Sequence, residues 1–253
     1  TTTGTQTLTF IPTSGFDGAV DNITIKAITN DEAQPNLAFI DDTGSIAFEA
    51  YANSSLANTF LGKDSGQKNT SGDLNTAVGY EALANNLYGS NNTALGGLAL
   101  KENTSGYMNT AVGASALTSN TTGYFNTAVG ANNLMSNTYG RYNTALGANN
   151  LTANISGRFN TAVGANVLTS NTGGFYNIGI GTNVLLNNTT GGSNLAVGNS
   201  ALNRNQTGTG NIAVGSSAMY FNTTGYWNLA IGNSALYFAD SAAYNMAVGS
   251  SAL

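Results

Sequence analysis

The residues from Asn109 to Gly123 read N-T-A-V-G-A-S-A-L-T-S-N-T-T-G, and most of the chain repeats this stretch. The glycine of A-V-G recurs with a 17-residue period from Gly62 to Gly249, twelve times without a change of register. The asparagine four positions before it recurs equally strictly, from Asn58 to Asn245. A second glycine follows ten positions after the first, from Gly72 to Gly225, and only Ala242 interrupts that column. Self-similarity at one fixed period is typical of a solenoid.

This period is too short for helical repeats, and β-branched residues, asparagine and two glycines per unit disfavour a helix. We therefore predict an all-β fold, a parallel β-solenoid of twelve coils over residues 58–253, preceded by a segment, 1–57, with short β-hairpins. In each coil A-V-G is expected to form one short strand and A-L a second. Twelve rungs spaced at about 4.8 Å make a rod of roughly 58 Å.

The alternation of side chains along a strand predicts which residues face inward. The residue before each glycine is always Val, Ile or Leu, and it is expected to point inward together with the Thr, Ile, Leu or Met two positions earlier. A leucine column that starts at Leu83 would complete the core. The intervening alanines, from Ala77 to Ala247, are expected to face outward as a flat surface on which three copies meet in a homotrimer. The asparagine columns are interpreted as turn residues, and asparagines stacked from rung to rung can in addition form amide ladders.

Composition excludes most catalytic and metal chemistry. Only 8% of the 253 residues are charged, and the chain has no His and no Cys. Thiol nucleophiles, His-based triads, zinc fingers and thiolate clusters are therefore excluded, and no acidic column for calcium recurs. The scattered acids, such as Asp17 and Glu49, are interpreted as solvated turn residues. We predict no enzyme, no catalytic residue, no metal and no cofactor.

Charge also limits the partners. The net charge is −5, so a basic surface for nucleic acid is not expected, and no apolar run approaches the roughly 20 residues of a membrane span. Residues 103–253 contain only Asp240, Arg141, Arg158 and Arg204 as charged side chains. Arg141 and Arg158 occupy equivalent positions one coil apart. They are interpreted either as a solvated pair or as a contact for an acidic sugar or a carboxylate of another chain.

The stretch from Asn109 to Gly123 resembles the YadA-like head repeats of trimeric autotransporter adhesins and the similar repeats of phage tail fibres. The resemblance covers residues 58–253, although the coils of adhesin heads are shorter. It implies a left-handed parallel β-roll, three identical chains, and surface attachment without catalysis.

The N-terminal segment does not follow the repeat. Strands are expected at residues 5–11 and 19–26, and a hairpin over residues 37–50 around Asp41-Asp42-Thr43-Gly44. This segment is expected to cap the first coil or to add as strands to a neighbouring subunit. The chain stops at Leu253 without a polar cap, so that end is expected to meet a further domain or the N-terminal segment of the next subunit.

Two sets of surface residues are candidate glycan sites. Exposed aromatic rings before the strand asparagine could stack on sugars, although packing between coils or against another chain explains them equally. These candidates are Tyr124, Phe125, Tyr142, Phe159, Tyr176, Tyr226 and Trp227. Turn asparagines that fall in N-x-[ST] sequons are candidates for glycosylation, although Asn-Thr-Thr-Gly is also simply a good turn. They are Asn69, Asn103, Asn120, Asn154, Asn188, Asn205 and Asn222.

Together these patterns predict a fibrous structural or adhesive protein without enzymatic activity, the shaft or head of a tail fibre or surface adhesin. The alternative is a subunit of a glycosylated extracellular filament that polymerises head to tail through its N-terminal strands. Both hypotheses place the protein outside the cell, on a cell surface or on a virion. Its expected partners are copies of itself, as a homotrimer or a polymer, and cell-surface glycans.

Overall fold

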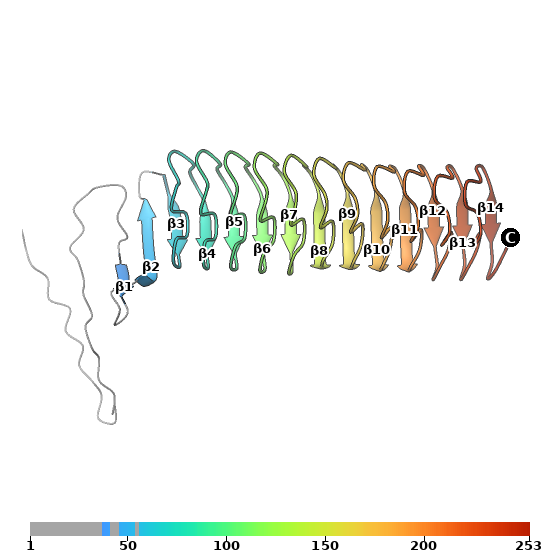
Figure 1. Cartoon of the computed structure of the whole chain (residues 1–253), viewed down its shortest axis with the longest axis horizontal. Coiled ribbons are helices and arrows are strands. Elements are labelled where there is room, and N and C mark those ends of the chain that lie inside the picture. Colours follow the sequence, from blue (N-terminus) through green and yellow to red (C-terminus); the bar gives the residue numbers. More distant parts are fainter. Residues whose placement is uncertain (1–36, 41–45, 54–55) are drawn as a thin grey trace, which may run out of the picture.

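The computed structural model describes residues 37–40, 46–53 and 56–253, and in these ranges the chain is all-β with no helix. Strands β3 to β14 lie side by side in chain order along a rod, and β1 and β2 lie at one end of it (Figure 1). The strands are β1 Leu37–Ile40, β2 Ile46–Asn53, β3 Asn58–Leu61, β4 Thr76–Val78, β5 Thr93–Leu95, β6 Thr110–Val112, β7 Thr127–Val129, β8 Thr144–Ala148, β9 Thr161–Ala165, β10 Ile178–Thr182, β11 Leu195–Asn199, β12 Ile212–Val214, β13 Leu229–Ile231 and β14 Met246–Val248.

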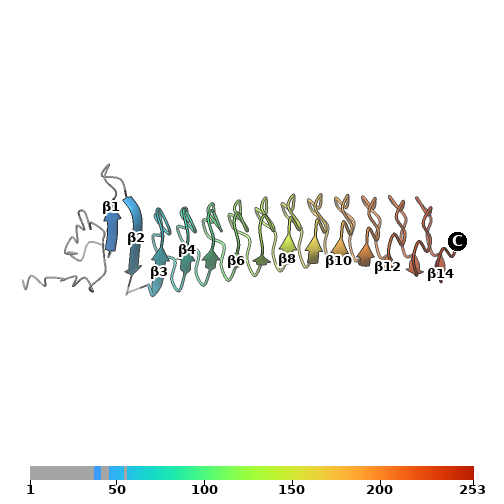
Figure 2. The same cartoon turned by 90° about the horizontal axis from the view of Figure 1, so that it is seen from below.

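The period of the sequence is one rung of a parallel sheet. Thr110 pairs with Thr127, and Thr127 pairs with Thr144, so each strand residue lies beside its equivalent in the next coil. The strands line one side of the rod and the turns lie on the other (Figure 2). The predicted parallel β-solenoid with a 17-residue spacing is therefore confirmed.

The predicted second strand at A-L was wrong. These residues lie in turns, because Ser115 and Leu117 both adopt left-handed backbone angles, with φ of 56° and 53°. Hydrogen bonding between coils nevertheless continues there, since the Leu117 amide donates to the Asn133 carbonyl at 3.0 Å. Each coil thus contributes one strand, and its turns stack as regularly as the strands do.

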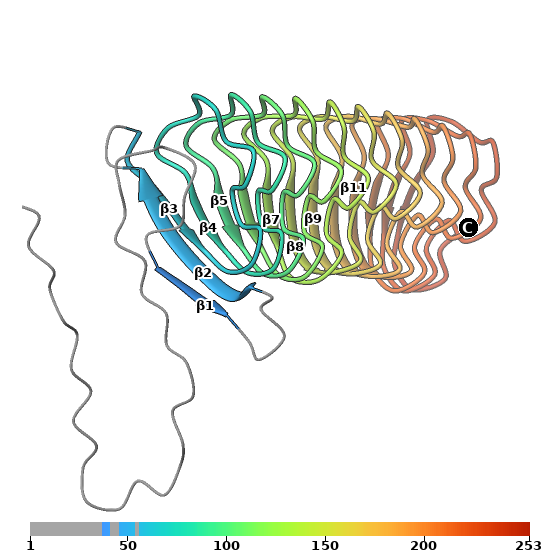
Figure 3. The ribbon, with the colours of Figure 1, turned by 60° about the vertical axis from the view of Figure 1, so that its left-hand side comes forward.

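The N-terminal hairpin is confirmed. Strand β1 pairs with β2 in an antiparallel register that places Leu37 opposite Ala50. Strand β2 also pairs antiparallel with β3, with Asn53 opposite Asn58, so the hairpin lies along the edge of the first rung (Figure 3). The strands predicted at 5–11 and 19–26 lie outside the described residues.

The prediction of which strand side chains point inward was wrong. The alanines of A-V-G, such as Ala111 and Ala128, are fully buried, whereas the residues on either side of them are partly exposed. The reason is the small distance between the sheet and the turn behind it. At Gly179, which replaces this alanine in one coil, an added Cβ would lie 2.4 Å from Val167 Cγ1. From β4 to β14 the inward position holds only alanine or glycine, and the larger side chains point outward; in β3 the buried Phe60 takes this position.

The predicted leucine column is confirmed except at Leu253. The leucine column is buried from Leu83 to Leu202, together with Met219, and Leu253 is exposed. Two asparagine columns, almost entirely buried, form the amide ladders that the sequence allowed. In the first, Asn126 Nδ2 donates to Asn109 Oδ1 at 3.1 Å and to the Gly140 carbonyl at 2.8 Å. These bonds satisfy buried amides in an interior without charges.

Candidate functional site

A stacked row of aromatic rings runs along the turns. Phe125, Tyr142, Phe159 and Tyr176 occupy the same position in consecutive coils, and their ring centroids are 5.1, 4.8 and 4.8 Å apart. The regular register of the coils places each ring over the next. Both faces of Tyr142 and Phe159 are therefore covered by neighbouring rings, and only their edges reach the surface. The interior members of this row stabilise the coils but do not present a ring face to a sugar.

The adjacent column contains the two arginines. Tyr124 stacks on Tyr107 at 4.9 Å, and the Arg141 guanidinium lies 5.6 Å from the Tyr124 ring centroid. Arg158 lies instead over Phe175, at 5.9 Å. Each arginine thus makes a cation–π contact with a different neighbouring coil, which offsets the repulsion between two like charges one rung apart.

The two remaining candidate aromatics are more open. Trp227 is 61% exposed, and its indole lies against Gly210, where an added Cβ would be 2.8 Å from the ring. Tyr226 contacts Tyr244 edge to face, with centroids 5.4 Å apart. Neither ring lies in a face-to-face stack in the described part of the chain, so both could receive a ligand on a face. Their role as glycan contacts stays a prediction.

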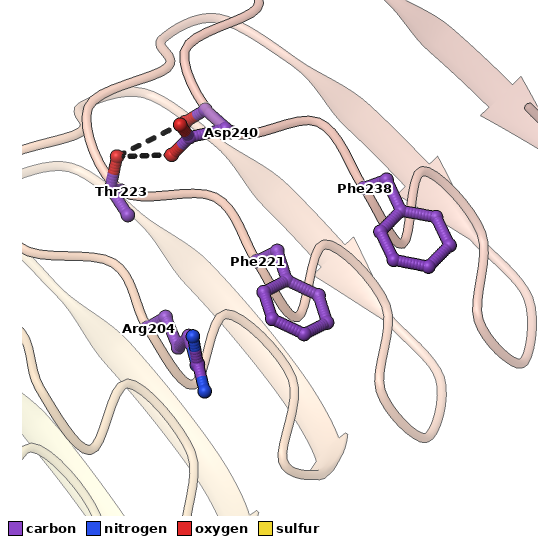
Figure 4. Close-up of a pocket in the computed structure, with 5 residues that line it drawn as sticks. All are labelled: Arg204, Phe221, Thr223, Phe238 and Asp240. Carbon is purple, nitrogen blue, oxygen red and sulfur yellow. Dashed lines mark hydrogen bonds between the residues drawn. The ribbon is translucent and has the colours of Figure 1, made fainter.

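A surface hollow of about 330 Å³ lies near the C-terminal coils (Figure 4). It is lined by Arg204, Phe221, Thr223, Phe238 and Asp240, all from the turns between β11 and β14. The Arg204 guanidinium lies 4.6 Å from the Phe221 ring centroid, and Phe238 stacks on Phe221 at 5.5 Å. The Thr223 hydroxyl donates to an Asp240 carboxylate oxygen at 2.5 Å. The hollow therefore combines two rings, one cation, one carboxylate and one hydroxyl.

The sequence analysis did not identify this hollow, although the sequence contains a pattern that marks it. In the nine coils that precede Phe221, the equivalent position never holds an aromatic residue. A comparison of columns across coils, rather than a search for motifs within one coil, would have found this departure from the repeat.

The sequon asparagines are mostly inaccessible. Six of the seven candidates are fully buried, and only Asn69 is half-buried. In Asn120, for example, the side-chain amide donates to Asn103 Oδ1 at 2.8 Å and to the Gly123 carbonyl at 3.0 Å. A glycan on this nitrogen would break both bonds and has no space in the folded rod. The repeated sequon is therefore explained by turn and ladder geometry. The six buried residues are Asn103, Asn120, Asn154, Asn188, Asn205 and Asn222.

The described acidic residues form no recognisable catalytic arrangement. Glu81 Oε2 lies 2.6 Å from Lys101 Nζ, and the Tyr80 hydroxyl donates to Glu81 Oε1 at 2.8 Å. The hydrogen bond from Lys101, and then that from Tyr80, lowers the pKa of Glu81, so this carboxylate stays ionised on the surface. Within residues 56–253 no three acidic side chains converge in a metal-binding group. In the described ranges there is also no helix of membrane-spanning length and hydropathy.

The outward face of the parallel sheet carries a row of apolar side chains along the whole solenoid. We call it the sheet stripe, and it consists of the outward-pointing first and third residues of β4 to β14, together with Thr59 and Leu61 of β3. In β10 these residues are Ile178 and Ile180, which are 41% and 42% exposed. The exposed large apolar residues of the stripe are Leu61, Leu95, Leu146, Ile178, Ile180, Ile212, Ile231, Met246 and Val248.

The chain matches no protein-family model, and neither a curated protein nor a solved structure shows significant similarity to it. The structure therefore defines the class, a β-solenoid repeat protein, through its own geometry.

Proposed function

We propose that this protein is a non-enzymatic rod of a tail fibre or surface adhesin, located outside the cell or on a virion, and that three copies associate through their sheet stripes. The observation that carries the proposal is a continuous column of Val, Ile and Leu side chains, each at least partly exposed, that runs along the sheet from Leu61 to Val248. The resemblance of the repeat to trimeric adhesin heads and tail fibres supports the number three.

The size of the stripe favours a partner. Two outward side chains per rung span about 10 Å, and eleven rung spacings of about 4.8 Å span about 53 Å, which gives roughly 500 Å². The first column of the stripe is Thr from Thr59 to Thr161 and apolar from Ile178 on, so the apolar part is smaller than the whole stripe. Contiguous apolar patches of a few hundred Å² on a soluble protein are often functional. A second copy of the chain has the same repeat spacing, so its side chains fit this stripe rung by rung. The outward-pointing Val, Ile and Leu side chains of the sheet are therefore the residues suited to pack between copies. The strand alanines, which were predicted to form the trimer interface, fill the interior instead.

The mechanical role follows from the repeat. Each coil makes its hydrogen bonds to the coils before and after it, and no charge is needed inside. Such a stack resists bending because any bend must break rung-to-rung bonds. A rod of this kind is suited to hold a binding surface at a distance from the particle or cell that carries it.

Light scattering after size exclusion tests the proposal. We expect one discrete species with the mass of three chains of 25.8 kDa each. Replacing Ile178 and Ile180 by lysine places six charges in the trimer interface and should yield a 25.8 kDa monomer. The matched control is Thr190→Lys with Thr207→Lys, which adds the same charge on exposed turns and should leave the trimer intact.

Two results would contradict the trimer. A 25.8 kDa wild-type monomer would show that the stripe is exposed in solution. A mass that grows with concentration without a limit would instead favour the alternative, a filament that joins head to tail, in which the N-terminal strands of one copy pair with another.

A further inference from the structure

We infer that the hollow lined by Arg204, Phe221, Thr223, Phe238 and Asp240 binds a single pyranose ring of an uncharged glycan. This inference goes beyond the proposed rod, which needs no ligand. It assigns sugar binding to the turns between β11 and β14, whereas the sheet stripe is proposed to bind only other copies of the chain.

The first argument is the local departure from the repeat. Eight coils before Arg204 have Lys, Asn, Glu, Ser or Ala at this position, and the next two have Phe221 and Phe238. The preceding position changes in the same coils, to Tyr220 and Tyr237. Four aromatic rings thus gather where the fold requires none, because nine other coils stack without them. A structural role in the repeat does not account for this cluster.

The second argument is the exposure of the rings. Phe221 lies between the Arg204 guanidinium and the Phe238 ring, so its orientation is held from both sides. Phe238 is 78% exposed and contributes most of the open aromatic surface. The C–H groups on the apolar face of a pyranose carry a small positive charge, and they pack well on the negative face of such a ring.

The third argument is the polar groups beside the rings. The Asp240 carboxylate accepts a hydrogen bond from Thr223 Oγ1, and a carboxylate has about four acceptor sites, so it can accept further bonds from sugar hydroxyls. The Arg204 guanidinium makes only cation–π contacts with Tyr220 and Phe221 in the described part of the chain, so its donors are available to hydroxyl oxygens. Hydroxyl groups both donate and accept, and they match this pair of partners.

The charge of the hollow selects an uncharged ligand. One guanidinium and one carboxylate line the same space, so an anionic sugar is attracted by Arg204 and repelled by Asp240. A volume of about 330 Å³ is at the lower end of ligand sites and suits one sugar ring rather than a chain of rings.

Saturation-transfer NMR and calorimetry on the full chain test the inference. The probes are methyl β-D-glucopyranoside, methyl β-D-galactopyranoside, methyl α-D-mannopyranoside and methyl β-D-glucuronoside. We expect at least one neutral glycoside to bind with a millimolar Kd, and the glucuronoside to bind more weakly than the glucoside. Phe238→Ala should weaken binding at least tenfold and Asp240→Asn at least fivefold. The control Tyr244→Ala removes an equally exposed ring (75%) of the same coil and should change binding less than twofold.

Four results would overturn the inference. They are no transfer to any neutral glycoside, binding that survives Phe238→Ala, equal weakening by Tyr244→Ala, or tighter binding of the glucuronoside. The mass of each variant, measured on the same sample, separates this inference from the rod. Lost glycoside binding in a species of three 25.8 kDa chains overturns only the sugar site, whereas retained binding in a 25.8 kDa monomer overturns only the trimer.

Discussion

The second glycine column is required by the asparagine ladder beside it. Three residues before each such glycine from Gly89 on, an asparagine donates its side-chain amide to the previous coil and to the glycine carbonyl, as Asn120 does to Asn103 Oδ1 and the Gly123 carbonyl. An added Cβ at Gly123 would lie 2.3 Å from Asn120 Oδ1 and 2.4 Å from the Gly140 carbonyl oxygen. The glycine therefore recurs along the chain for space rather than for an unusual backbone angle.

Two adjacent glycines allow a matched test of this point. In Gly174→Ala the new Cβ would lie 2.3 Å from Asn171 Oδ1 and 2.5 Å from the Gly191 carbonyl oxygen, whereas at Gly173 its closest neighbour is 3.6 Å away. We expect Gly174→Ala to lower the free energy of unfolding by about 1–3 kcal/mol because it overpacks a rigid ladder. Gly173→Ala should be neutral or stabilise by up to about 1 kcal/mol. Urea unfolding followed by circular dichroism checks both, and equal effects would disprove the role of the ladder.

The coil of β13, residues 228–244, lacks both members of this asparagine–glycine pair. Its ladder position holds Ala239, its glycine position holds Ala242, and the buried Asn222 Oδ1 has no hydrogen-bond partner. We expect the double variant Ala239→Asn with Ala242→Gly to extend the ladder by one rung and to stabilise the rod by about 1 kcal/mol. Ala239→Asn alone should give no gain, because the Ala242 Cβ occupies the space for its amide. Unfolding midpoints of the two single variants and the double variant measure this coupling, and additive effects would contradict it.

At the scale of the element, a smaller inward residue in the strand is accompanied by a larger residue in the turn packed against it. In most coils an inward alanine of the strand faces a second alanine that precedes the core leucine. In β10 the strand residue is Gly179, and Val167 and Val184 occupy the position of that second alanine. The added Cβ at Gly179 would lie 2.4 Å from Val167 Cγ1 and 3.4 Å from Val184 Cγ1. The two valines therefore fill the space left by the missing Cβ of Gly179, and the distance between the strand and the turn need not change.

This exchange predicts a rescue. Gly179→Ala should destabilise the rod by about 1–3 kcal/mol, since neither partner can move far in a packed interior. Adding Val167→Ala restores the common alanine pair and should recover most of the loss. The double-mutant cycle in urea then gives a coupling of about 1 kcal/mol or more. A coupling near zero would show that the two side chains do not share the space.

The strand also shows where sequence reasoning reached its limit. Alternation separates Ala128 from Thr127 and Val129, but it does not say which set faces inward. Larger apolar residues usually face the core, and here the narrow coil reverses that order. The left-handed angle of the buried Leu117 was equally hidden, because leucine rarely adopts it. The leucine core, the asparagine ladders and the N-terminal hairpin were predictable, since a fixed period forces equivalent residues to stack.

For the whole molecule, the sheet stripe and the hollow differ in origin: residues that recur in every coil form the stripe, whereas residues that depart from the repeat form the hollow. The sheet stripe arises from the repeat itself and could be predicted as an apolar column, although it was assigned to the wrong side of the sheet. The hollow between Arg204 and Asp240 needs residues of three coils to depart from the repeat together. A search for motifs within one coil does not detect such a site.

The final prediction concerns the rod as a stack of interchangeable coils. Deleting residues 110–126 removes one full period and joins Asn109 to Thr127, so every column, ladder and strand pairing is preserved at the junction. Because the stability of a solenoid is approximately a sum over units and their interfaces, we expect the shortened chain to fold with the same circular dichroism per residue and a slightly lower melting temperature. Deleting only residues 110–118 leaves a coil about half as long, too short to leave the sheet and return to it, and should break the stack into separate parts that melt independently. If both deletions melt alike, the full repeat is not the unit of folding; if only the full period is tolerated, the rod is built one rung at a time.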